Sequence, residues 1–227
     1  SLVYVPSADQ AYQSLEYLNY VQPLGWYVRA LHDFFANAMV LMLICHLVQV
    51  VIFAAYKYPR ELTWIFGVIL FLCVAAMAFT GQILRWDQDA YWGLGIGATM
   101  PGRIPLIGPY AVHPMLGGPI TGGETPPRFF TLHVFILPST IAGVLAIHVM
   151  FVFKNGISDP PKAGRLVNPA TEREEYEERI SGEDGTTFCP TPVARDAICS
   201  GGLVIVVALL AAMLGPNGPN GMPDPTI

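Results

Sequence analysis

Charged residues are scarce in this sequence, and this scarcity limits what the protein can be. Only 13% of the residues are Asp, Glu, Lys or Arg, whereas 53% are hydrophobic and the mean hydropathy is +0.46. Soluble domains carry about 25% charged residues, so the composition favours a protein of the lipid membrane. Basic residues are outnumbered, with 12 Lys and Arg against 17 Asp and Glu. No basic surface for nucleic acid is therefore expected.

Cysteine is also rare, and its spacing argues against two kinds of site. The sequence has neither the cysteine spacing of a zinc site nor a Cys-x-x-Cys-His motif for covalent attachment of a c-type haem. The chain begins at Ser1 without a basic and then apolar stretch, so no targeting segment can be identified. We interpret the four cysteines as structural: Cys45, Cys73, Cys189 and Cys199.

Long apolar runs, by contrast, are abundant. A helix needs about 20 apolar residues to cross a bilayer, and aromatic residues commonly flank such a run. Trp26, Tyr27, Tyr56 and Tyr58 flank the first run in this way. We expect an all-α transmembrane four-helix bundle with a long outer loop and an extra C-terminal span. The predicted spans are residues 26–55, 62–84, 129–153 and 198–214.

Polar segments between these runs divide the chain into four expected parts. A short amphipathic helix is expected at 11–18 and a solvent-exposed acidic helix at 172–178, whereas prolines prevent a continuous helix through the loop at 82–128. The parts are an N-terminal interfacial segment (1–25), a transmembrane core (26–158), a cytoplasmic-side polar linker (159–197), and the fourth span with its tail (198–227).

Positive charge predicts the orientation of the spans. The loop after the first span carries Lys57 and Arg60, and the segment after the third span begins with Lys154. Cytoplasmic loops are enriched in such residues, so we expect both segments on the inner side. The loop at 82–128 should then lie on the outer side.

Four histidines stand inside the first and third spans at nearly equal intervals. His32 and His46 are 14 positions apart, so both rings should lie on one helix face about 21 Å apart along the axis. His133 and His148 are 15 positions apart in the third span, where Pro138 is expected to kink the helix. Because the two spans run in the same direction, His32 should meet His133 near the outer side. His46 should meet His148 near the inner side.

Facing imidazoles inside a bilayer suit bis-histidine ligation of a haem. Gly67 and Gly81 in the second span repeat the 14-residue interval, as expected if this helix loses side chains at two levels to make room for flat groups. Small-residue helix packing is an alternative reading of the glycines, and isolated core histidines are an alternative reading of the pairs. Zinc is disfavoured because each level offers only two nitrogens. A haem-free proton-coupled transporter would require acids inside the spans, where Asp33 is the nearest candidate.

Several motifs resemble the cytochrome b/b6 family of quinol-oxidising complexes. The resemblance extends over about residues 3–158, and the 15-position interval is similar to the split, plastid-type and Gram-positive-type branch of that family. The motifs are Gly-Trp-Tyr-Val-Arg-Ala-Leu-His at 25–32, Pro-Arg-Glu-Leu-Thr-Trp at 59–64, Thr-Gly-Gln-Ile-Leu-Arg-Trp-Asp-Gln at 80–88, Tyr-Trp at 91–92, Ile-Pro-Leu-Ile-Gly at 104–108, Arg-Phe-Phe-Thr-Leu-His at 128–133 and Lys-Asn-Gly-Ile-Ser at 154–158.

The resemblance implies a dihaem cytochrome b subunit of a quinol:electron-acceptor oxidoreductase, in a bacterial plasma membrane or a thylakoid-type membrane. Electrons from quinol would cross two b haems to an inner quinone site and contribute to a proton gradient. By the family pattern, His32 and His133 bind the iron of the low-potential outer haem. His46 and His148 bind that of the high-potential inner haem.

Further site residues are implied by the same resemblance. Arg29 would pair with a haem propionate, and Lys154 lies near the inner haem and the inner quinone site. Arg85 stands where the plastid-type motif has proline, and it adds a charge at the outer pocket. One wall of the outer quinol pocket would be formed by Trp86, Asp87, Gln88, Tyr91 and Ile107.

The resemblance also implies partners. They are a Rieske iron–sulfur protein, a c-type cytochrome subunit and a second copy in a homodimer. A C-terminal-half cytochrome b subunit or segment is also expected, because the family's Pro-Glu-Trp-Tyr motif does not follow the lead-in at 221–227. An extra c-type haem is not supported by the residues present. An alternative is a dihaem membrane anchor of another quinone-linked reductase, against which the Trp-Asp-Gln loop argues.

Overall fold

The computed structural model of the chain is helical in all the regular structure that it describes, and it describes residues 3–106, 108–158, 168, 170–182 and 190–215. Four helical segments are long and apolar enough to cross a membrane. The prediction of an all-α fold with four candidate spans is therefore confirmed. Their bounds are Gly25–Ile52 (α2), Glu61–Ile83 (α3), Thr125–Asn155 (α6, η1 and α7 in succession) and Thr191–Leu214 (α9).

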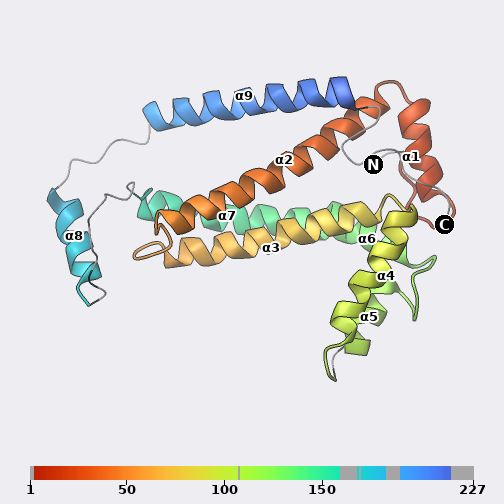
Figure 1. The fold of residues 1–227 in the computed structure, drawn as a ribbon, viewed down its shortest axis with the longest axis horizontal. Coiled ribbons are helices and arrows are strands. Elements are labelled where there is room, and N and C mark those ends of the chain that lie inside the picture. The colour runs from red at the N-terminus through yellow and green to blue at the C-terminus, as the bar shows by residue number, and fades with distance from the viewer. Residues whose placement is uncertain (1–2, 107, 159–167, 169, 183–189, 216–227) are drawn as a thin grey trace.

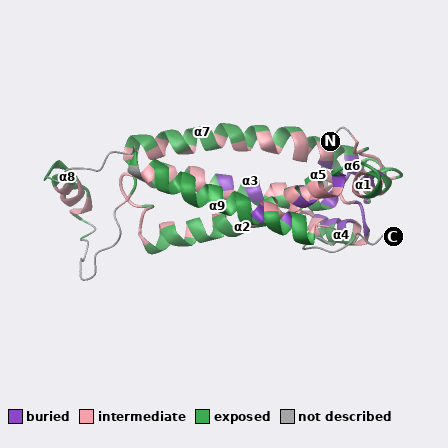
Figure 2. Cartoon of the chain, turned by 90° about the horizontal axis from the view of Figure 1, so that it is seen from above, coloured by how far each residue is buried: buried purple, intermediate pink, exposed green. Residues whose placement is uncertain are grey.

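The long helices form two packed pairs. α3 lies along α7 (Leu137–Asn155), and α9 packs against α2, with the Tyr27 hydroxyl donating to the carbonyl of Ala208 at 3.4 Å (Figure 1). Most residues on the spans are exposed or half-buried, as the green and pink of Figure 2 show, and the side chain of Met213 is 77% exposed. This is the surface expected of helices that contact lipid rather than water.

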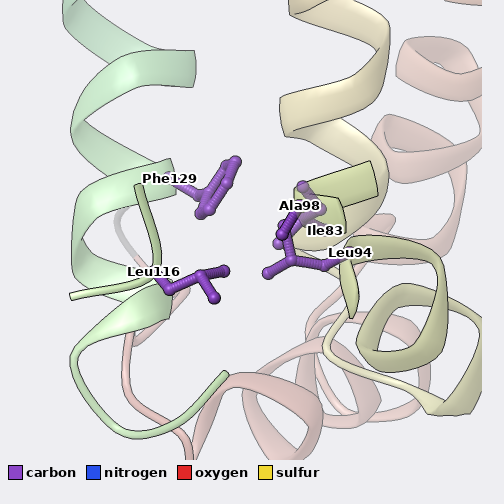
Figure 3. Packing of buried hydrophobic residues seen from close by; sticks show 5 residues of the cluster. All are labelled: Ile83, Leu94, Ala98, Leu116 and Phe129. Atoms are coloured by element: carbon purple, nitrogen blue, oxygen red, sulfur yellow. The ribbon is translucent and has the colours of Figure 1, made fainter. Parts of the chain in front are cut away.

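The buried core lies at one end of the bundle. It joins the end of α3 to α4 (Gln88–Gly102), α5 (Gly108–Leu116) and α6 (Thr125–Thr131). Burying each large apolar side chain stabilises this end by about 1.5–3 kcal/mol. The core therefore holds α4 and α5 against the predicted outer end of the spans. Figure 3 shows the five side chains that form it: Ile83, Leu94, Ala98, Leu116 and Phe129.

The segment expected as an outer loop at 82–128 is largely helical. Its prolines separate short helices: Pro101 stands in the last turn of α4, and Pro126 and Pro127 stand in the first turn of α6. Proline is tolerated in a first turn because the N–H that it lacks has no partner within the helix there. The prolines thus prevent one continuous helix, as expected, without preventing helical structure.

A π-helical turn lies in the third span, directly before the proline at which a kink is expected. This turn, η1 (Leu132–Ile136), contains His133, and the N–H of Leu137 donates to the carbonyl of Leu132. Pro138 follows directly and has no N–H to donate. A wider turn before the proline lets the span continue, and such turns are frequent at functional sites.

Two short helices lie at opposite ends of the bundle (Figure 1). α1 (Ala11–Tyr20) contacts α2 and is slightly longer than expected. α8 (Glu172–Gly182) is the acidic helix, and it is solvent-exposed as expected, with no buried residue. Single side chains connect it to the loop that follows α2. The Tyr58 hydroxyl donates to Glu177 at 2.8 Å, and Arg60 donates to the Tyr176 hydroxyl at 3.1 Å.

Three cysteines are free thiols, namely Cys45, Cys73 and Cys199, and Cys189 lies outside the described residues.

Candidate functional site

His32 and His133 face each other near the predicted outer end of the spans. His32 comes from α2 and His133 from η1, and their ring centroids are 6.1 Å apart with 54° between the ring planes. A metal bonds an imidazole nitrogen at about 2 Å. The separation therefore fits one metal ion held between a nitrogen of each ring.

Hydrogen bonding determines which nitrogen of His133 is free. Its Nδ1 lies 3.1 Å from the carbonyl oxygen of Met77 and 3.1 Å from Oγ1 of Thr80. A carbonyl oxygen can only accept, so Nδ1 carries the ring proton and Nε2 keeps its lone pair. The Thr80 hydroxyl donates to the carbonyl of Ala76 at 2.8 Å. His133 is thus held by one nitrogen and presents the other as a ligand.

His148 on α7 is held in the same way at the predicted inner end. Its Nδ1 lies 3.0 Å from the carbonyl oxygen of Thr63, so Nδ1 is again the donor and Nε2 is free. His46 on α2 lies within electrostatic range of His148. Donation from Nδ1 to a backbone carbonyl is the usual way in which a metal-binding histidine is oriented.

Gly67 and Gly81 lie directly against the histidines of the third span. A Cβ at Gly81 would stand 2.7 Å from Cε1 of His133, and a Cβ at Gly67 would stand 3.2 Å from Cε1 of His148. Any side chain at Gly81 would thus collide with the imidazole. The missing side chains on α3 leave room for the two rings themselves, at the two levels where flat groups were expected.

The π turn explains why intervals of 14 and 15 residues hold matching levels. A π turn closes its hydrogen bond over five residues rather than four, so it adds one residue to the helix path. η1 runs from Leu132 to Ile136, so most of this turn lies between His133 and His148. Their interval of 15 positions is then equivalent to 14 in an uninterrupted α-helix, as on α2.

Arg85 and Asp87 form an ion pair where α3 passes into α4. The Asp87 side chain is 1% exposed, and its Oδ1 accepts from the N–H of Ala90 at 2.9 Å, which caps the start of α4. The charge that Arg85 adds at the outer end is thus balanced by Asp87. Arg29 is half-buried on α2, one turn before His32, and within electrostatic range of both residues.

The other residues predicted for the outer pocket lie around the start of α4. Trp86 is buried and meets Tyr91 edge to face at a centroid distance of 6.2 Å, and Gln88 is half-buried. Ile107 lies outside the described residues. Lys154 is exposed in the last turn of α7, far along that helix from η1. Trp86 and Asp87 therefore support the fold at the start of α4, whereas Tyr91 and Gln88 reach the surface there.

Sequence reasoning missed the groups that orient the histidines. Met77 and Thr63 act through backbone carbonyls, which no residue pattern reveals, and Thr80 acts through its hydroxyl. The one available signal was the position of Thr80, directly before Gly81. Among the described residues no group of three or more His, Cys, Asp or Glu side chains could hold a metal ion, so the two histidine levels remain the candidate cofactor sites.

The fold and the outer histidine pair define the class of protein: a multi-pass helical membrane protein in which His32 and His133, from two different spans, lie close together. The family model described as Cytochrome b(N-terminal)/b6/petB matches residues 37–223. The chain belongs to this cytochrome b/b6 family, whose members hold haem b, and is an integral membrane protein.

Relatives and a solved structure agree with this assignment. The chain is 41% identical to a cytochrome b6 of Prochlorococcus marinus strain MIT 9515 over 157 residues, which is 69% of this chain and 72% of the relative. It is 40% identical to the cytochrome b6 of strain MIT 9211 over the same length. A chain of a hyperthermophilic respiratory Complex III matches the whole structure with a TM-score of 0.80 at 25% identity. This protein covers 57% of the length of that chain.

Proposed function

We propose that this chain is the dihaem cytochrome b subunit of a quinol:electron-acceptor oxidoreductase of the Rieske/cytochrome b type. The observation that carries the proposal is the pair of imidazole levels, with the His32 and His133 rings 6.1 Å apart at one of them. His32 and His133 bind the outer, low-potential haem, and His46 and His148 bind the inner, high-potential haem. Each haem supplies a one-electron carrier when it is bound there.

The residues around each histidine level orient the imidazole rings, leave space for them and offer a positive charge. The carbonyls of Met77 and Thr63 accept the Nδ1 protons of His133 and His148, so both Nε2 atoms would be free to bind haem iron. Gly81 and Gly67 keep α3 clear of the two rings. Arg29, one turn from His32, offers its guanidinium to a propionate of the outer haem.

The two ends of the bundle serve the two quinone reactions in this proposal. The start of α4, with Tyr91 and Gln88 at its surface, forms one wall of the outer quinol pocket. Lys154 lies at the inner end, where quinone is reduced and where it pairs with anionic groups of the inner haem. Family membership supports a Rieske iron–sulfur protein, a c-type cytochrome, a C-terminal-half cytochrome b segment and a second copy of the chain as partners.

A redox titration of histidine variants in the assembled complex tests this assignment. His148→Leu or His46→Leu should remove the b-type component of higher potential and leave the other. His113→Leu serves as the matched control, because His113 is an exposed histidine in α5, away from both levels. Loss of the lower-potential component from the His148 variant would show that the pairing or the orientation is wrong.

A further inference from the structure

The two ligand histidines that lie against α3 differ in their hydrogen bonding. Nδ1 of His133 has two oxygen partners, the Met77 carbonyl and Thr80 Oγ1, each at 3.1 Å. Nδ1 of His148 has the carbonyl of Thr63 at 3.0 Å, and the nearby hydroxyl of Thr63 is buried without a hydrogen-bond partner among the described residues. Among the described residues, Nδ1 of His133 therefore has a hydroxyl partner in addition to a carbonyl, and Nδ1 of His148 has a carbonyl partner alone.

The direction of each hydrogen bond follows from the acceptors. The Met77 carbonyl can only accept, so the proton lies on Nδ1 of His133. Thr80 has a single hydroxyl proton, and both of its acceptors are carbonyls of α3, that of Ala76 at 2.8 Å and that of Met77 at 3.1 Å. Oγ1 of Thr80 therefore presents a lone pair to the Nδ1 proton. Thr80 is 5% exposed, and its hydroxyl is held in this position by the hydrogen bond that it donates within α3.

We infer that the Thr80 hydroxyl lowers the reduction potential of the outer haem through its contact with Nδ1 of His133. The inference rests on the proposed function. A second acceptor on Nδ1 draws the ring proton away, which makes Nε2 a stronger donor to iron and favours the ferric state. Thr80 is thus a positioning residue that acts through His133, and it contributes to the potential difference that drives electrons from the outer haem to the inner one.

Substitutions that remove only the hydroxyl test this inference in the purified complex. Thr80→Val replaces the hydroxyl with a methyl group of similar size, and Thr80→Ser restores a hydroxyl. Thr140→Val is the matched control, because Thr140 makes the same kind of bond, to the carbonyl of Ile136 at 2.8 Å on α7, and is exposed. The readouts are the midpoint potentials of both b-type components and the low-spin ferric electron paramagnetic resonance signal of the outer haem.

The expected result is a positive shift of the outer potential in Thr80→Val, an unchanged inner potential, and values close to wild type in Thr80→Ser and Thr140→Val. An unchanged outer potential, or an equal shift of both haems, overturns the inference. If Thr80→Val does not assemble, Thr80→Ala removes the same hydroxyl and is read by the same two criteria. A wild-type complex without two b-type components would instead refute the proposed function, so the two failures are distinguishable.

Discussion

Replacing Gly81 with alanine should disturb the outer haem site much more than the same change at Gly67 disturbs the inner one. A Cβ at Gly81 would stand 2.7 Å from Cε1 of His133, and a Cβ at Gly67 would stand 3.2 Å from Cε1 of His148. Ordinary van der Waals contact begins at 3.4 Å. The His133 ring must therefore withdraw by about 0.7 Å and the His148 ring by about 0.2 Å.

The size of the displacement of the His133 ring decides whether the outer haem is retained. A withdrawal of about 0.7 Å is roughly a third of a metal–imidazole bond of about 2 Å. The hydrogen bonds of Nδ1 to Met77 and Thr80, both 3.1 Å, resist a sliding of the His133 ring along α3. The helix itself should not suffer, because alanine is favoured over glycine within a helix by about 0.5–1 kcal/mol. We expect Gly81→Ala to lose the outer haem and Gly67→Ala to retain the inner one.

A pyridine haemochrome assay gives the haem content of each variant, and a redox titration shows which haem is lost. Gly143→Ala is the matched control, because nothing lies within 4 Å of a Cβ at this glycine of α7. It should retain both haems at unchanged potentials. The reasoning is refuted if Gly81→Ala holds two haems with wild-type potentials, or if Gly67→Ala is the variant that loses its haem.

Three further predictions concern the two ends of the bundle. Arg85→Met leaves the buried carboxylate of Asp87 without its cation and should destabilise the protein by about 3–5 kcal/mol, measured as a lower midpoint of thermal unfolding. Adding Asp87→Asn removes the unpaired charge, and because asparagine can still cap α4, the double variant should recover part of the lost stability. The hydrogen bond to Glu177 raises the pKa of Tyr58 above its ordinary 10.0, so Glu177→Gln should lower it in an ultraviolet titration. Because that pKa is raised in the folded protein, the contact stabilises α8 docking below about pH 10 and is lost as the pH rises further. Arg60→Ala should speed amide hydrogen exchange in α8 without changing haem content, since this side chain bonds the carbonyls that follow α7 and a ring hydroxyl of α8.

The spans and the histidine levels could be predicted because both depend on local periodicity. An apolar run of span length permits few structures in a membrane, and the 14-residue interval on α2 keeps two rings on one face whatever surrounds them. The 15-residue interval in the third span was harder to explain from sequence, because its equivalence to 14 depends on the π turn that precedes Pro138. That turn is a response of the backbone to the proline and has no composition signal of its own.

Apart from the meeting of His32 with His133, contacts between residues distant in the sequence could not be predicted. The bond from Tyr58 to Glu177 joins positions 119 apart, and it connects the solvent-exposed acidic helix to the loop that follows α2. The prolines of the outer loop predicted that no continuous helix runs through it, but they gave no sign of the short helices there, of which α4 is capped by Asp87 and held by a small apolar core. An aspartate before a run of helix-compatible residues was the local signal for that helix.

The haem content of the purified chain tests the central claim most directly. Two b-type haems per chain in an alkaline pyridine haemochrome assay, both low-spin with two imidazole ligands, are the expected result for the levels formed by His32 with His133 and by His46 with His148. A purified chain with no b-type absorbance, or with a single haem that survives substitution of any one of the four histidines, would contradict the account.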